Sequence, residues 1–314
     1  MPPPRAALLQ MHACVLLWGF TAILGKLIAL PALALVWWRM LLVAGALLLL
    51  PRVWCSLASM GPRLLAIYAG IGVLVALHWL TFYGSIKLAN ASVAVTCMAL
   101  APVFVAIAEP LLARRPLQVR ELLLGVAVIP GVALVVGGIP GDMLSGMLWG
   151  IVSALLVALF GILNKQVVER ADALGMTCAE LGAGAVFLTL AAPWLSDTAP
   201  WSPPGVADGA LLLVLAFACT LLPFALSLVA LRHLSAFTAQ MTVNLEPVYA
   251  IVLAWLLLGE QRELAVHFYV GVAIVLGAVF AQPLLHLRRL RSRPAAVAEG
   301  AEAQVLGESP GRMD

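Results

Sequence analysis

Charged side chains are scarce in this sequence. Only 11% of its 314 residues are Asp, Glu, Lys or Arg, and 63% are hydrophobic. A soluble domain has about 25% charged and roughly 45–50% apolar residues, so the composition excludes an ordinary soluble globular protein. The formal net charge is only +3 and the basic residues are scattered between apolar runs, which argues against a nucleic-acid partner.

The common motifs of ATP hydrolysis and hydrolytic catalysis are absent. There is no Walker loop, no His-Glu-x-x-His and no Gly-x-Ser-x-Gly pattern, so the chain does not drive transport with ATP itself and we expect no enzyme activity. The five histidines are too dispersed for a metal site, and no cofactor is expected. The five cysteines lack Cys-x-x-Cys spacing, which favours packing roles over a disulfide framework.

Long apolar runs are abundant. A membrane span needs about 20 mainly apolar residues, and the apolar windows predict an all-α membrane protein with ten transmembrane helices. The first run is longer than a usual signal segment and is followed at once by a second, so we interpret it as an uncleaved span. The expected spans are 8–30, 33–50, 64–86, 91–112, 120–138, 143–164, 173–195, 210–231, 236–258 and 264–285.

The distribution of Lys and Arg predicts the orientation. With the N-terminus inside, thirteen of these residues fall on inner segments, and only Lys26, Lys87 and Arg262 fall on outer ones. Because Lys and Arg favour the cytoplasmic side, both termini are expected in the cytoplasm and the protein in a bacterial inner membrane. Residues 286–314, basic and then rich in small residues and Glu, are expected to form a disordered cytoplasmic tail.

An internal repeat divides the spans into two groups of five. An offset of 145 aligns Pro102 with Pro247, and one more residue aligns Gly125–Gly131 with Gly271–Gly277. The predicted repeats are residues 1–139 and 140–285. Each contains an odd number of spans, so the second enters the membrane from the opposite side and the repeats are inverted, as in many secondary carriers.

Several local motifs resemble the drug/metabolite transporter superfamily, specifically its EamA-type bacterial members with ten spans. The resemblance implies a basket of helices in which spans 1, 3, 4, 6, 8 and 9 surround a central cavity and spans 5 and 10 pack outside. The sequence departs from a symmetrical pattern at Arg114-Arg115, the counterpart of Gly259-Glu260. The matching motifs are Trp18-Gly19-Phe20, Lys26, Arg39, Pro102, Asn244-Leu-Glu-Pro-Val-Tyr249, Leu258-Gly259-Glu260 and Gly271.

Polar residues inside apolar spans are the candidates for function, because an ionisable group at mid-bilayer costs about 2.5–3.5 kcal/mol on insertion scales. Glu246 lies near the centre of its span, and on a continuous helix it shares a face with Thr238, Thr242 and Tyr249. Pro247 and Pro102 each free a backbone carbonyl one turn earlier. The alternative is that these prolines only bend packed helices and the threonines bond neighbouring helices.

Aromatic and basic residues suggest further contacts. His78, Trp79, Phe82 and Tyr83 could stack on a substrate or belong to an interfacial belt. Trp18 lies nearer mid-span. Arg39 is interpreted as structural, and Glu180 could pair with Asn164 or Lys165, or take up protons.

These observations predict a secondary transporter that exports a small polar metabolite, such as an amino acid or derivative, by alternating access. The alternatives are a facilitator or channel and, less favoured, a membrane-embedded lipid-modifying enzyme. The expected partners are the substrate and membrane lipid; a homo-oligomer stays open, because Gly146-x-x-x-Gly150 is only a weak contact signal. The substrate-binding candidates are Trp18, His78, Trp79, Tyr83, Thr96, Thr238, Thr242, Asn244, Glu246 and Tyr249; the proton-coupling candidates are Glu246 and Glu180; the structural candidates are Arg39, Pro102 and Pro247.

Overall fold

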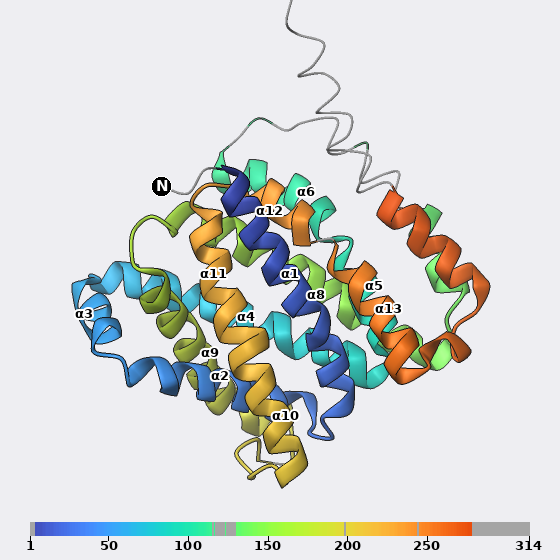
Figure 1. Ribbon diagram of the computed structural model, residues 1–314, viewed down its shortest axis with the longest axis horizontal. Coiled ribbons are helices and arrows are strands. Elements are labelled where there is room, and N and C mark those ends of the chain that lie inside the picture. Colours follow the sequence, from blue (N-terminus) through green and yellow to red (C-terminus); the bar gives the residue numbers. More distant parts are fainter. Residues whose placement is uncertain are drawn as a thin grey trace, which may run out of the picture.

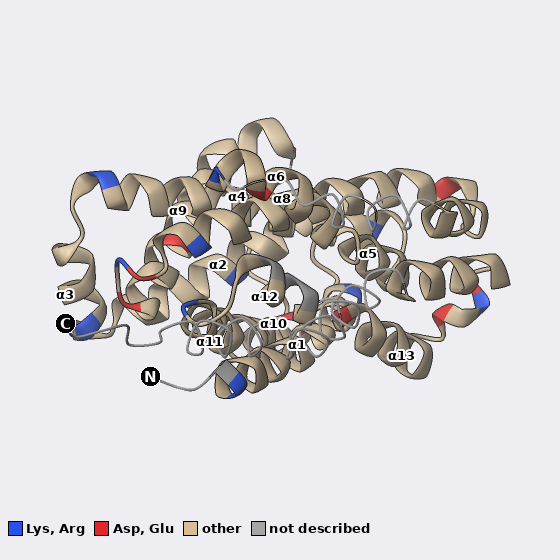
Figure 2. Cartoon of the chain, turned by 90° about the horizontal axis from the view of Figure 1, so that it is seen from above, with Lys and Arg blue, Asp and Glu red and all other residues tan. Residues whose placement is uncertain are grey.

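A computed structural model of the chain describes residues 4–114, 116, 123, 130–197, 199–243 and 245–277, and these residues form helices joined by short turns, with no strand among them (Figure 1). The expected all-helical membrane protein is therefore confirmed. Charged residues are few, and most lie at turns and helix ends (Figure 2). Apolar side chains cover the rest of the helices, as expected for a protein surrounded by lipid.

The helices follow the predicted spans closely but break some of them. The first half contains α1 (Pro4–Leu27), α2 (Ala32–Leu48), α3 (Pro51–Ser59), α4 (Pro62–Leu88), α5 (Ala91–Met98) and α6 (Ala101–Ala113), and residues 130–137 are also helical. The second half contains η1 (Gly141–Met143), α8 (Leu144–Val167), α9 (Ala173–Leu195), α10 (Val206–Ala216), η2 (Phe217–Leu221), α11 (Leu222–Leu231), α12 (Ala236–Val243), α13 (Glu246–Leu258), η3 (Glu260–Arg262) and Val266–Gly277.

By length and composition, six helical segments in the described part of the chain could each cross a membrane. A seventh is obtained if α2 and α3 count as one span, although they meet at 94°. The last two apolar helices, Glu246–Leu258 and Val266–Gly277, are shorter. The structure thus shows several spans, while the count of ten stays a prediction; residues 120–122 and 124–129 of the expected span 120–138 lie outside the described residues.

The predicted fourth and ninth spans are each divided into two helices, and they correspond at a constant offset of 145 residues. Pro102 and Pro247 stand at the start of α6 and α13, where a residue without an N–H fits best. Both helices end on a left-handed residue, Arg114 at φ 52° and Gly259 at φ 71°. The two broken helices therefore share the same breaks and stops, as copies of one unit would.

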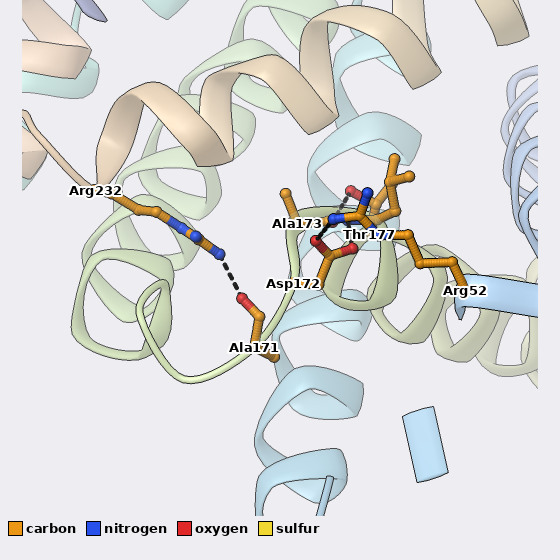
Figure 3. A network of polar contacts seen from close by, with 7 residues as sticks. Arg52, Ala171, Asp172, Ala173, Thr177 and Arg232 are labelled. Atoms are coloured by element: carbon orange, nitrogen blue, oxygen red, sulfur yellow. Dashed lines mark hydrogen bonds and ion pairs between the residues drawn. The ribbon is translucent and has the colours of Figure 1, made fainter. Parts of the chain in front are cut away.

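Polar contacts at one end of the bundle hold the turn between α8 and α9. Arg52 of α3 donates to Asp172 at 2.7 Å, and Arg232 donates to the carbonyl oxygen of Ala171 at 2.5 Å (Figure 3). Lys165 donates to the carbonyl oxygen of Leu231 at 2.8 Å. We call this end, which also contains α3, the α3 end.

The opposite end is tied together around Glu260, which is 1% exposed. One oxygen of its carboxylate accepts from the backbone N–H of Ala91 at 3.0 Å. The other accepts from the N–H and the hydroxyl of Ser92, at 2.9 and 2.7 Å. The carboxylate thus caps the first turn of α5 from the turn after α13, some 169 residues away. Figure 1 shows α5 and α13 side by side. We call this end the η3 end.

A candidate substrate cavity

A cavity of about 140 Å³ lies between helices of both halves of the chain. Its wall is contributed by α1, α2, α4 and α5 from the first half and by α8, α11, α12 and α13 from the second. Most of the wall is apolar or aromatic, with a few polar groups, as is typical of a small-molecule site. The polar and aromatic lining residues are Trp18, Thr21, Arg39, His78, Trp79, Phe82, Phe160, Asn164, Phe224, Ser227 and Glu246.

Arg39 is the basic residue of this wall, and three contacts fix its guanidinium group. Nε donates to the hydroxyl of Thr220 at 2.5 Å, and Nη1 donates to the hydroxyl of Tyr83 at 2.8 Å. The group also lies 3.8 Å above the ring of Trp79, a favourable cation–π geometry. The side chain is 2% exposed. Its Nη2 group makes no hydrogen bond to a described residue, so it is available to an anionic group in the cavity.

The position of Thr220 depends on a local irregularity in the predicted eighth span. Residues Phe217–Leu221 form a π-helical turn between α10 and α11, and the Thr220 hydroxyl donates to the carbonyl oxygen of Leu215 at 2.5 Å. Such turns are rare and occur frequently at functional sites. Here the turn presents a hydroxyl oxygen to Arg39, which joins the second half of the chain to α2.

Glu246 is the acidic residue of the cavity wall. It is the first residue of α13 and is 8% exposed, and its carboxylate makes no hydrogen bond within the described part of the chain. Arg39 and Glu246 attract each other electrostatically. One cavity therefore carries a guanidinium group and a carboxyl group, contributed by the two halves.

Aromatic residues of α4 form much of the remaining wall. His78 stacks on Phe82 with ring centres 6.2 Å apart, and its Nδ1 lies 2.8 Å from the hydroxyl of Ser153. Trp79 packs edge-on against Phe224, with the ring centres 6.1 Å apart. The structure thus places Trp18, His78 and Trp79 on the cavity wall. Tyr83 lies behind it, fully buried and bonded to Arg39.

Several other candidates do not line this cavity. Thr96 and Thr242 bond backbone carbonyls of their own helices, and Thr238 bonds Ser235. Tyr249 is 41% exposed on α13. Of the expected polar face, Glu246 lines the cavity, whereas Thr242 and Tyr249 do not. Asn244 lies outside the described residues.

The sequence analysis missed part of the wall. Thr21, Ser227, Phe160 and Phe224 line the cavity, but nothing in their local sequence distinguishes them from packing residues. Asn164 was named only as a partner for Glu180; it lines the cavity and donates to Glu180 at 3.4 Å. Arg39, expected to be structural, also contributes to the wall.

Comparison with known proteins agrees with the fold. The model of the EamA-like transporter family matches residues 5–137 and 144–281. No curated protein sequence matches the chain. Twenty-two chains of solved structures match; one, described only as "Crystal structure of protein", has a TM-score of 0.65 and 16% identity, with 91% of this chain and 99% of the other covered. The resemblance noted from the sequence is confirmed, and the chain belongs to the EamA-like transporter family of membrane proteins.

Proposed function

We propose that the protein is a secondary carrier that exports a small polar metabolite, such as an amino acid or an amino-acid derivative. Membership of a transporter family supports transport itself. The observation that carries the substrate class is the presence of Arg39 and Glu246 on one cavity wall. A guanidinium group held in place and a carboxyl group complement a molecule that bears both charges, and the aromatic wall suits its uncharged part.

Unequal access from the two ends supports alternating access. The cavity reaches the α3 end, because Leu231, the last residue of α11, and Ala236, the first of α12, both line it. At the η3 end, Glu260 ties α13 to α5. A carrier needs a site that opens to one side at a time. If the α3 end is cytoplasmic, as the Lys and Arg distribution predicts, this conformation can load cargo for export.

The proposal includes inverted repeats at 1–139 and 140–285, a cytoplasmic tail at 286–314, and a bacterial inner-membrane location with both termini in the cytoplasm. A single cysteine is placed at either the N-terminus or the C-terminus of a cysteine-free variant. In both cases it should resist a membrane-impermeant thiol reagent in intact cells and react after the membrane is opened. Reaction of only one end in intact cells would contradict the inverted arrangement.

Counterflow in sealed proteoliposomes tests the carrier itself. We expect saturable exchange of at least one compound from a panel of radiolabelled amino acids. Glu246→Gln should raise its half-saturation concentration by roughly 10- to 100-fold, because a hydrogen bond to a charged group contributes about 1.5–3 kcal/mol and 1.4 kcal/mol is about tenfold. Glu169→Gln, at an exposed position beyond α8, is the matched control and should behave as wild type.

Two results would overturn this proposal. Flux that rises linearly with concentration and never saturates would indicate a channel or an open facilitator. Consumption of a lipid substrate by the purified protein, with no solute exchange, would indicate an enzyme.

A further inference from the structure

A second buried carboxyl group lies beside the cavity but is not part of its wall. Glu180, the eighth of the 23 residues of α9, has no exposed surface. Its main chain packs against Gly72 of α4, where an added Cβ would lie 2.8 Å from the carbonyl carbon of Glu180. This close contact fixes the depth of the side chain between α4 and α8.

The hydrogen bonding of this carboxyl group is incomplete. Asn164 of α8 donates its Nδ2 to one carboxyl oxygen at a long 3.4 Å. The other carboxyl oxygen and the amide oxygen of Asn164 are both buried without a partner among the described residues. Buried polar atoms without partners are rare because each costs about 1–3 kcal/mol. Two such oxygens on one hydrogen-bonded pair of residues indicate that the pair binds a further group.

The charges around Glu180 do not balance an ionised carboxylate. From α4, Tyr68 interacts with it electrostatically, but the hydroxyl donates to the carbonyl oxygen of Val167 at 3.0 Å. Arg39 of α2 donates hydrogen bonds to the hydroxyl groups of Thr220 and Tyr83 instead. Arg52 of α3 pairs with Asp172.

The remaining basic groups near this region belong to α8, the turn after it, and the residue after α11. Lys165 donates to the carbonyl oxygen of Leu231, and Arg232 donates to that of Ala171. Arg170 interacts electrostatically with Tyr68. None of these described groups forms an ion pair with Glu180. A bare carboxylate at this depth is costly, so a neutral carboxyl group fits the surroundings better.

A proton fits the two oxygens, and a metal ion does not. Cations such as Mg²⁺ and Ca²⁺ need six or more oxygen ligands, and the described residues hold no cluster of His, Cys, Asp and Glu suited to a metal ion. A protonated Glu180 needs a single acceptor. After a half-turn of the Asn164 amide, the carboxyl O–H can donate to the amide oxygen, which gives the proton and that amide oxygen a partner.

We propose that Glu180 and Asn164 form a proton-binding site, that Glu180 carries the proton exchanged against substrate, and that Glu246 binds substrate instead. The proposal rests on the carrier function above. Asn164 lies on the cavity wall and so separates Glu180 from cavity water. On release, the carboxyl O–H bond breaks, the proton passes to a cavity water, and the remaining carboxylate accepts from the Asn164 amide. Glu246 lines the same cavity as Arg39 and is assigned to the substrate.

Infrared difference spectroscopy of the purified protein tests protonation without any substrate. As the pH is raised, the wild-type protein should lose a carbonyl stretch of a protonated carboxyl group. Glu180→Gln should lack this band, and Glu109→Gln, which changes another buried carboxyl group of the bundle, should keep it. Asn164→Leu should shift the band rather than remove it, because Asn164 positions the proton through a hydrogen bond. A merely structural asparagine would leave the band where it is.

Transport measurements test coupling. A pH difference should accelerate uptake of the exchanged amino acid by wild type and Glu109→Gln. Glu180→Gln should lose this acceleration but still carry out counterflow, which needs no net proton movement. Glu180→Asp, which keeps a carboxyl group, should retain part of the acceleration and serves as a check against misfolding of the glutamine variant.

The outcomes separate this inference from the carrier proposal. Retention of the protonated-carboxyl band in Glu180→Gln, undiminished acceleration in that variant, or acceleration by a Na⁺ gradient in place of a pH difference would each overturn the proton site. If no amino acid is exchanged by wild type but the band depends on Glu180, the substrate class fails and proton binding stands.

Discussion

Replacing Arg39 with alanine is expected to reduce the apparent affinity for the exchanged solute roughly 100-fold, because it removes the fixed positive charge of the cavity. Hydrogen bonds to charged groups contribute about 1.5–3 kcal/mol, and each 1.4 kcal/mol changes an affinity about tenfold. The loss is enlarged because Glu246 is left without an opposite charge in a space of low polarity. Half-saturation concentrations in counterflow measure the effect.

Lysine at position 39 separates charge from geometry. It keeps the positive charge but cannot engage Thr220 and Tyr83 at once as the guanidinium does, because an ammonium group is a compact point charge without the planar fork. We therefore expect Arg39→Lys to lose roughly tenfold in affinity, between wild type and Arg39→Ala. If lysine were as damaging as alanine, the role of Arg39 would be the structural link to the π-helical turn.

The control for Arg39 is an exposed arginine that also bonds a residue distant in the sequence. Arg52 pairs with Asp172 (Figure 3), but its side chain is 73% exposed, and exposed ion pairs contribute only about 0–1 kcal/mol. Arg52→Ala should thus transport as wild type does. Retention of full affinity in Arg39→Ala, with Arg52→Ala also unaffected, would remove Arg39 from the substrate site.

The helical architecture was predictable because its cause is local in sequence. Apolar runs that match the membrane thickness specify helices directly. The breaks before α6 and α13 were not predicted, although Pro102 and Pro247 stand at both of them. The 94° bend between α2 and α3 was missed. Pro51 starts α3 there, but a proline alone does not tell whether a helix simply ends or the chain turns sharply into a second helix.

The candidate site was predictable only in part, because its wall is assembled across the whole chain. Glu246, His78, Trp79 and Trp18 were found because a polar or aromatic residue is conspicuous within an apolar span. Ser227 was not found, because serine also bonds its own helix, as it does here to Phe224. The role of Glu260 requires a partner 169 residues earlier, and no local pattern reveals such a contact.

Removing the charge of Glu260 is expected to release the η3 end of the bundle. Its buried carboxylate accepts three hydrogen bonds from the first turn of α5. Glu260→Gln keeps the shape but loses the charge and one acceptor oxygen, which should cost about 2 kcal/mol. If α13 parts from α5 when the cavity opens at this end, the population of that open form should rise roughly 30-fold.

Thiol labelling from the outside measures this opening. Met98 lies on α5 and lines the cavity, so a single cysteine at position 98 of a cysteine-free variant reports access through the η3 end. Glu260→Gln should raise its labelling rate with a membrane-impermeant reagent, whereas Glu263→Gln, the same change at an exposed position that bonds Asn90, should not. Equal rates in both variants would mean that this contact stabilises the fold without holding the end shut.

The two repeats differ at the position of Glu260, and this difference indicates which end of the bundle is held closed. With the offset of 145, the counterpart of Asn90, which caps α5, is Ser235, which caps α12, and the counterpart of Glu260 is Arg115. An anion beside a helix N-terminus is stabilising and a cation is unfavourable, and in the sequence the position that corresponds to the capping carboxylate of Glu260 carries a basic residue. The resting carrier should therefore keep the η3 end closed and the α3 end accessible.

Arg115→Glu is expected to counteract the effect of Glu260 by favouring closure of the α3 end. A single cysteine that replaces Leu231, near the α3 end, should then be labelled more slowly by a thiol reagent added on the inner face.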